Sequence, residues 1–270
     1  MAETTLFYRS SGDENPRTIV FIHGWPDDCE MWQHQVCVLE AHYRCVAVTL
    51  PNFGPTADKS GGYPFATLVE MLKHTIDEVQ PSGEPVYLVT HDWGAYIGYL
   101  FEAAHPDMVE RMVALDIGAH GQPTPKEFLM IIGYQWTLIA GWLLGGVIPP
   151  LGNALSRLLG RGLKLSAPRV GRIRSRFAYP YFYLWMDLLL PWRRGNLIGR
   201  YTPRCPVLFI HGHRKPVMFH SQRWLSIVEK TGGRCERVDE GDHWFMETHP
   251  ERVNRMIREW LPAAPVPSDS

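Results

Sequence analysis

The chain has 270 residues, of which 45% are hydrophobic and 20% are charged, and its formal net charge at pH 7 is -1. This balance is typical of a chain with a sizeable core, long enough for one large α/β domain or two small domains. The near-zero net charge argues against nucleic acid as a partner. The five cysteines include no Cys-x-x-Cys pair, which disfavours a disulfide framework and favours a reducing, cytoplasmic location.

Apolar segments and helical patterns alternate along most of the chain. Strands are predicted at six places: 17–24, 43–50, 85–90, 109–118, 205–212 and 234–241. Helical periodicity is found near residues 31–41 and over 65–79, and a last helix is expected after residue 243. Short, doubly buried strands that alternate with helices are typical of an α/β fold, in which a mainly parallel sheet is covered by helices on both faces.

This alternation stops between residues 121 and 200, which predicts a helical cap inserted in a core made of residues 1–120 and 201–270. No charged residue occurs from Phe128 to Ser156, and the stretch from there to Met186 has seven basic residues and no acid. The apolar part is long enough for a membrane-spanning helix, but four glycines and a Pro-Pro pair interrupt it. Two alternatives stay open: the cap packs on its own core, or its apolar and basic surface makes a peripheral contact with a membrane.

The segment VYLVTHDWGAYIGYLF, residues 86–101, has the pattern of a nucleophile elbow, which is a strand, a tight turn and a helix. Asp92 stands at the apex, where the familiar version has serine. Aspartate is already ionised at pH 7, so it can attack the sp³ carbon of an epoxide or an alkyl halide, and the resulting ester can be hydrolysed at its carbonyl. The alternative is a turn carboxylate, because aspartate tolerates strained turns. Thr90 departs from the small residue with which such elbows usually begin.

Two motifs, FIHGWPDD at 21–28 and HDWGA at 91–95, together make the chain resemble the α/β-hydrolase superfamily, in the branch of epoxide hydrolases and haloalkane dehalogenases. The resemblance extends over the whole chain apart from its two ends. It implies an α/β-hydrolase fold in which Asp92 attacks the substrate and forms an alkyl-enzyme ester. His243, in the loop after the last strand, would then activate the water that hydrolyses this ester.

The same resemblance implies an oxyanion hole made by the backbone N–H groups of Trp25 and Trp93. Pro26 is expected to fix the turn beside Trp25 through a cis peptide bond. His23 and His91 flank the two motifs and are expected to form hydrogen bonds within the loops. No metal or other cofactor is expected, because the remaining histidines lack ligand spacing with acids or cysteines.

The acid of the catalytic triad is the least regular part of the pattern. In most members of the family it follows the strand predicted at 205–212, but this chain has HGHRKP there, with Lys215 at the position of the acid. A lysine cannot accept a hydrogen bond from imidazole. Some members place the acid after the strand that follows the elbow helix, and Asp116 holds that position. We therefore expect Asp116 to be the acid; the alternative is a turn carboxylate.

Cap tyrosines distinguish the two reactions of this branch. Epoxide opening leaves an alkoxide, so the family supplies two tyrosine hydroxyls from the cap. The candidates are Tyr134 and Tyr183, with Tyr181 as the alternative to the second. A dehalogenase needs N–H donors for the halide, for which the indole of Trp93 qualifies. A second indole would have to come from the cap, where the candidates are Trp136, Trp142, Trp185 and Trp192.

The sequence therefore favours hydrolysis of a lipophilic epoxide to a diol. A haloalkane dehalogenase that uses the same aspartate is the alternative enzyme. A catalytically weak protein that binds ligands is the alternative of another class, prompted by Lys215. The expected partner is a small apolar molecule, and a fatty-acid epoxide is a further hypothesis, since its carboxylate would meet the basic stretch of the cap. The oligomeric state stays open.

Overall fold

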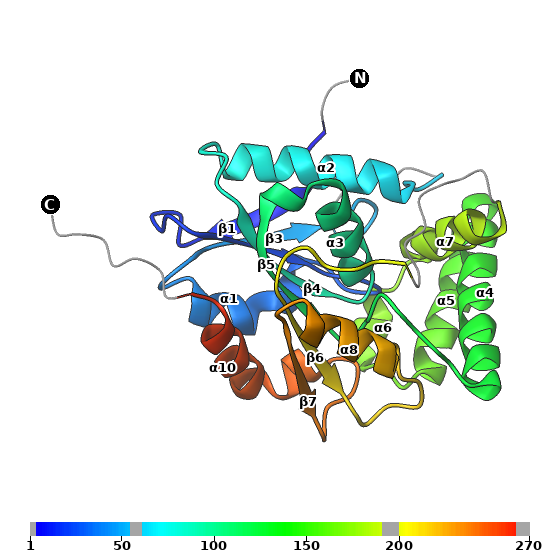
Figure 1. The fold of residues 1–270 in the computed structure, drawn as a ribbon. Helices are drawn as coiled ribbons and strands as arrows, with labels where there is room; N and C mark the ends of the chain where they lie inside the picture. The colour runs from blue at the N-terminus through cyan, green and yellow to red at the C-terminus, as the bar shows by residue number, and fades with distance from the viewer. Residues whose placement is uncertain (1–3, 55–60, 191–199, 263–270) are drawn as a thin grey trace, which may run out of the picture.

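The structure is a computed structural model and describes residues 4–54, 61–190 and 200–262. A seven-stranded sheet with the order β1-β3-β2-β4-β5-β6-β7 lies at its centre (Figure 1). The strands are β1 (Phe7–Ser11), β2 (Thr18–Ile22), β3 (Arg44–Thr49), β4 (Val86–His91), β5 (Val109–Leu115), β6 (Val207–Gly212) and β7 (Arg234–Val238). The pair β1–β3 is antiparallel, and all the other pairs are parallel. The predicted α/β fold is confirmed, and β1 is an edge strand that the sequence did not predict.

The central strands are buried along their whole length because helices cover both faces of the sheet. Every residue of β2, β4 and β6 is buried. The parallel register pairs Ile22 with Thr90, Thr90 with Ala114, and Leu115 with Ile210. The carboxyl ends of these four strands therefore meet at one edge, and the loops that follow them lie together.

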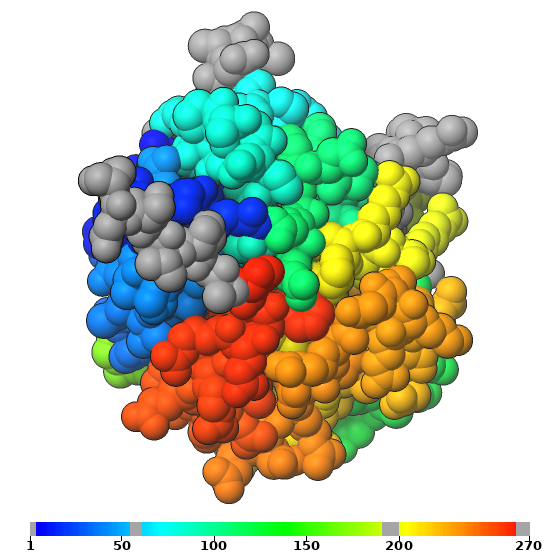
Figure 2. Space-filling model, turned by 60° about the vertical axis from the view of Figure 1, so that its left-hand side comes forward, coloured from blue at the N-terminus to red at the C-terminus, as the bar shows by residue number. Residues whose placement is uncertain are grey.

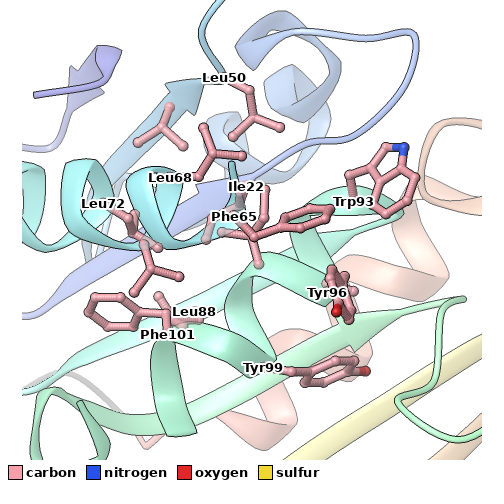
Figure 3. Close-up of a cluster of buried hydrophobic side chains, with 14 of the residues drawn as sticks. Ile22, Leu50, Phe65, Leu68, Leu72, Leu88, Trp93, Tyr96, Tyr99 and Phe101 are labelled. Atoms are coloured by element: carbon pink, nitrogen blue, oxygen red, sulfur yellow. The ribbon is translucent and has the colours of Figure 1, made fainter. Parts of the chain in front are cut away.

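Two helical layers enclose the sheet. Side chains of α2 (Phe65–Val79), α3 (Trp93–Ala104) and α8 (Gln222–Lys230) form one core cluster, part of which Figure 3 shows between the strands and α2. On the other face, α1 (Gln33–Leu39), α9 (Phe245–Thr248) and α10 (Pro250–Trp260) form a second cluster. Figure 2 shows the C-terminal helices, in orange and red, beside the blue N-terminal part of the chain. The predicted helix over 65–79 has its predicted bounds, whereas the one near 31–41 is a 3-10 turn (Cys29–Trp32) followed by α1.

The cap lies between β5 and β6 in the chain and to one side of the core in space (Figure 1). Its helices are α4 (Pro125–Val147), α5 (Pro149–Gly162), α6 (Ala167–Arg172), and α7 (Tyr179–Leu189), which follows a 3-10 turn (Ser175–Ala178). Thr124 caps α4 and forms a reciprocal capping box with Glu127, and the Pro-Pro pair opens α5. Trp192, one of the candidate halide donors, lies outside the described residues.

Candidate active site

Asp92 occupies the sharp turn between β4 and α3, with a φ of 53° and a ψ of -122°. The turn is so tight that the neighbouring backbone leaves no room for side chains. A Cβ added to Gly24 would lie 2.2 Å from Asp92 Oδ1, and one added to Gly94 would lie 2.1 Å from the carbonyl oxygen of Ile22. Glycine at both positions therefore lets the HGWP loop and the start of α3 come together around the carboxylate.

Thr90, the unusual residue at the start of the elbow, is accommodated by a second glycine. Its hydroxyl donates to the carbonyl oxygen of Val113 at 3.3 Å. Its methyl group lies against Gly98 of α3, where an added Cβ would come within 3.0 Å of it. Glycine at position 98 of α3 thus leaves room for the Thr90 side chain, so a small residue at position 90 is not required.

Backbone N–H groups fix the orientation of the Asp92 carboxylate. Trp25 donates its backbone N–H to Asp92 Oδ1 at 2.7 Å, and the expected cis bond between Trp25 and Pro26 is present. Asp92 Oδ2 lies 3.6 Å from His243 Nε2. Burial raises the pKa of Asp92, but the hydrogen bond and charge of His243, with the backbone N–H of Trp93, outweigh it and hold the pKa below its usual range. Asp92 is therefore a carboxylate at neutral pH.

Asp116 lies at the end of β5 and contacts the imidazole of His243. Asp116 Oδ2 is 2.6 Å from His243 Nδ1, and the Asp116 side chain is fully buried. Asp116 Oδ1 accepts from the ammonium of Lys215 and, at 3.2 Å, from the backbone N–H of Gly212. The structure thus brings together Asp92, His243 and Asp116, and it places Lys215 against the far oxygen of Asp116.

This arrangement accounts for a lysine at the position where the sequence resemblance led us to look for the acid. Burial raises the pKa of Asp116, but the charge of Lys215 and the hydrogen bond of His243 hold it well below its usual range. Burial lowers the pKa of Lys215, and Asp116 partly offsets this. For His243, burial lowers the pKa, but the hydrogen bonds and charges of Asp116 and Asp92 raise it to about 9. The buried carboxylate of Asp116 thus forms hydrogen bonds with two cations, the Lys215 ammonium and the His243 imidazolium.

His91 holds the loop that carries His243. Its Nε2 lies 2.8 Å from the carbonyl oxygen of His243, and the two rings are 4.4 Å apart. Burial, and then the charge of His243, lower the pKa of His91 to about 3, so the ring is neutral and donates from Nε2. His23 likewise receives the N–H of Leu50 at Nε2 and contacts the Gly24 carbonyl through Nδ1, as expected for loop hydrogen bonds.

A cavity of about 200 Å³ opens above Asp92, between the cap and the core. Its described lining is apolar and aromatic and comes from α3, α4, α7 and the loops after β5 and β6. Asp92 is its one charged lining residue, and no basic side chain is among those described. Asp92, Trp93, Tyr134, Gln135 and Tyr181 are among the lining residues.

Tyr134 and Tyr181 both line this cavity, whereas Tyr183 does not. The rings of Tyr134 and Tyr181 meet edge to face at 6.0 Å, and Tyr181 packs at 4.8 Å against Trp93. The hydroxyl of Tyr183 donates to the carbonyl oxygen of Gly61 at 2.7 Å, on the exterior of the protein. The structure therefore places Tyr181 in the cavity and the expected Tyr183 outside it, because residues two positions apart point about 200° apart around a helix.

The ionisation and orientation of the cavity tyrosines favour hydrogen-bond donation. Burial raises the pKa of Tyr181 well above its ordinary value, and the charge of Asp92 adds to this. Burial also raises the pKa of Tyr134. Gln135 positions this corner: its amide donates to the Tyr134 oxygen at 3.3 Å, and its carbonyl accepts from the Trp185 indole at 2.9 Å. Both phenols stay protonated at neutral pH.

An ion cluster in which Arg169 and Asp27 are buried joins α6 to the HGWPDD loop and to α9. Arg169 of α6 donates to Asp27 of the HGWPDD loop at 2.7 Å and to Glu247 of α9 at 2.5 Å. Its guanidinium also lies over the ring of Trp244, 4.7 Å from the centroid, and the Trp244 indole donates to Asp27 at 2.8 Å. The sequence alone does not predict this cluster, since nothing local to the three segments indicates that they meet.

Comparisons with known proteins agree with this geometry. Residues 19–256 match the model of the Alpha/beta hydrolase family. The epoxide hydrolase srdG of Neurospora crassa is 34% identical over 295 aligned residues, which cover 90% of this chain and 86% of that protein. The fold is similar to that of a Bacillus megaterium epoxide hydrolase in complex with an inhibitor (TM-score 0.69, 23% identity, 94% and 95% of the two chains covered). It is also similar to that of a haloalkane dehalogenase from Bradyrhizobium elkanii (TM-score 0.68, 19% identity, 94% and 91% covered).

The chain therefore belongs to the alpha/beta hydrolase family. Within the family it is an enzyme of the epoxide hydrolase-like type.

Proposed function

We propose that the protein hydrolyses a neutral, apolar epoxide to a diol through an ester on Asp92. The observation that carries this proposal is that two phenols, those of Tyr134 and Tyr181, line the same cavity as Asp92. An alkyl halide leaves as an anion that needs no proton, whereas an epoxide oxygen does need one. Protonated phenols opposite a carboxylate supply what epoxide opening requires.

In the first step, Asp92 Oδ2 attacks a ring carbon and the C–O bond of the epoxide breaks. The electron pair stays on the oxygen, which takes a proton from one of the two tyrosines. The imidazolium of His243 returns a proton to that tyrosine. Formation of the ester removes the carboxylate charge that helps to hold the pKa of His243 near 9, so the imidazole is released as a neutral base.

In the second step, His243 takes a proton from water, and the hydroxide attacks Cγ of Asp92. Negative charge develops on Oδ1, which the N–H of Trp25 already contacts at 2.7 Å. The ester C–O bond then breaks, and the diol oxygen takes the proton of the newly formed Asp92 carboxyl group. Asp116 keeps His243 oriented and charged, and the cycle ends with the ionisation states with which it began.

Trapping the ester tests the nucleophile. His243→Gln leaves Asp92 able to attack but removes the base, so incubation with a reactive epoxide should add the full mass of that epoxide to the peptide with Asp92. His243→Gln/Asp92→Asn is the control and should stay unmodified. The proposal fails if no epoxide of a broad panel leaves an adduct on Asp92.

Phenylalanine variants test the proton donors. Tyr134→Phe and Tyr181→Phe should each lower kcat/KM for an epoxide by about 100-fold, at the low end of what a general acid contributes. Tyr183→Phe, which loses a hydrogen bond outside the cavity, is the matched control and should stay within about twofold of wild type. Equal losses in all three variants would contradict the assignment.

One observation favours a second candidate, haloalkane dehalogenation. The indole N–H of Trp93 is buried and has no hydrogen-bond partner among the described residues, so it can donate to a departing halide. The trapping experiment separates the two reactions by mass. A haloalkane adds its alkyl group with loss of the halogen, whereas an epoxide adds its whole mass.

A further inference from the structure

Large apolar side chains are exposed along one side of α4. Leu129, Trp136, Leu143 and Val147 have exposed fractions of 70, 43, 54 and 82%. Their spacings of seven, seven and four residues place them on a single side of the helix. Helix α4 forms the outer edge of the cap in Figure 1. A surface helix of a globular protein normally turns its apolar side toward the core. On α4 an apolar side faces outward.

Helix α5 also exposes large apolar side chains. Leu151 and Leu158, which are also seven residues apart, are 50 and 61% exposed. Among the described residues, α4 is the one helix long and apolar enough to cross a membrane, yet little of it is buried within the protein. We define the cap face as the six residues Leu129, Trp136, Leu143, Val147, Leu151 and Leu158.

The contact between α4 and α5 explains why the bulky residues point outward. A Cβ added to Gly152 of α5 would lie 2.4 Å from the carbonyl oxygen of Gly141 and 2.4 Å from the Cα of Gly145, both on α4. A Cβ on Gly141 would come within 2.7 Å of Ser156 Oγ. Small residues four apart on both helices thus form the interface, which is how helices pack against each other in lipid.

Basic residues border the cap face. Arg161 follows Leu158 by three residues on α5, and Lys164 follows by another three; both are exposed. Among the described residues neither has a carboxylate partner. The chain has no acid between Phe128 and Met186. The edge of the cap face therefore carries positive charge that the protein itself does not neutralise.

We propose that the cap face binds peripherally to an anionic lipid bilayer, with Arg161 and Lys164 at the headgroups. Apolar residues flanked by basic ones are the combination that anionic membrane surfaces attract. A second copy of this chain would instead bring an equally cationic surface toward the first. Helix α4 lies on the membrane and does not cross it, because its opposite side lines the cavity through Tyr134 and Gln135.

The consequence for the reaction rests on the proposed function. In that orientation only the thickness of α4 lies between the lipid and the cavity, so an apolar epoxide that partitions into the bilayer is concentrated close to the site that contains Asp92. The basic stretch of the cap then has a role other than binding a substrate carboxylate. That agrees with the lining of the cavity, which includes no basic side chain among the described residues.

Vesicle flotation tests the lipid contact without any substrate. Wild-type protein should float with vesicles of phosphatidylcholine and 30% phosphatidylserine, and much less with pure phosphatidylcholine. Each basic residue near an anionic surface strengthens partitioning roughly fivefold, so Arg161→Gln/Lys164→Gln should weaken it about 30-fold. Trp136→Ser/Leu143→Ser/Val147→Ser should abolish flotation. Phe7→Ser, an exposed apolar residue of β1 outside the cap, should leave it unchanged.

Circular dichroism and turnover of a water-soluble epoxide, without vesicles, show whether each variant is folded and whether the proposed chemistry holds. These readouts are independent of flotation, so loss of one proposal is distinguishable from loss of the other. The lipid proposal is overturned if wild-type protein floats with neither vesicle, or if the cap variants float as well as wild type. A stable wild-type dimer in light scattering that Trp136→Ser/Leu143→Ser/Val147→Ser converts to monomer would also overturn it, in favour of a second copy.

Discussion

Replacing Lys215 with methionine removes the charge from a buried ion pair while keeping most of the side-chain volume. The Lys215 side chain is 4% exposed and that of Asp116 is fully buried. Breaking a buried pair on one side costs about 3–5 kcal/mol, because the other charge is left uncompensated. Asp116 keeps its contacts with His243 and Gly212, so we expect the low end, about 3 kcal/mol. For a chain of this size that corresponds to roughly 6–12 °C in Tm.

Urea denaturation at pH 7 measures this loss, and Arg237→Met is its matched control. Arg237 contacts Asp239 at 2.7 Å, but both side chains are more than half exposed. An exposed pair contributes roughly 0.2–1 kcal/mol, so the control should lose less than about 1 kcal/mol. The two variants differ chiefly in burial, which isolates the effect that we assign to the site.

A double-mutant cycle of Lys215→Met with Asp116→Asn tests whether the two charges compensate each other. If Lys215 and Asp116 compensate each other, removing both charges should cost less than the sum of the single losses, by more than about 0.5 kcal/mol. Additive losses would show that the two charges do not interact as described. A Lys215→Met protein as stable as wild type would also refute the expected loss of about 3 kcal/mol in the free energy of unfolding.

Three further changes test other contacts. Asp92→Asn removes the carboxylate charge beside His243, so the pKa of His243 should fall below 9 in an NMR titration; an unchanged value would contradict the proposed release of the base on ester formation. Gly98→Ala should lower the free energy of unfolding by about 1 kcal/mol through its contact with the Thr90 methyl, and adding Thr90→Ser should remove that loss; a loss that persists refutes the packing. Arg169→Met should cost about 3 kcal/mol in urea denaturation, since it leaves two carboxylates near the cap without their counter-charge, and a loss below 1 kcal/mol would argue against it.

The core of the fold was predictable because its signals are local. Six strands and the helix over 65–79 follow from runs and periodicities within a few residues of each other. Strand β1 was not predicted, since Phe7–Ser11 has no buried apolar run; it is held at the edge by its antiparallel pairing with β3. Pairing of that kind joins segments far apart in the chain, and a single sequence does not reveal it.

In the candidate site, too, the residues with local signals were predictable and those that depend on distant parts of the chain were not. Asp92, His243 and Asp116 were found from motifs and strand ends, and the structure places them within hydrogen-bonding reach or close to it. The second cavity tyrosine depended on the rotation of α7, which the alternation of aromatic residues in that helix conceals. Lys215 was recognised only as a missing acid, because its partner lies 99 positions earlier in the chain.

The Arg169 cluster has a mechanical consequence. It fixes α6 to the HGWPDD loop and to the segment that follows His243, so this end of the cap cannot move away from the core without breaking buried ion pairs. Displacement of α7 costs less by comparison, because its hydrogen bond from Tyr183 to the Gly61 carbonyl joins neutral groups. Because Trp244 lies next to His243 and contacts the cluster, a displacement of α6 would also act on the orientation of the His243 imidazole.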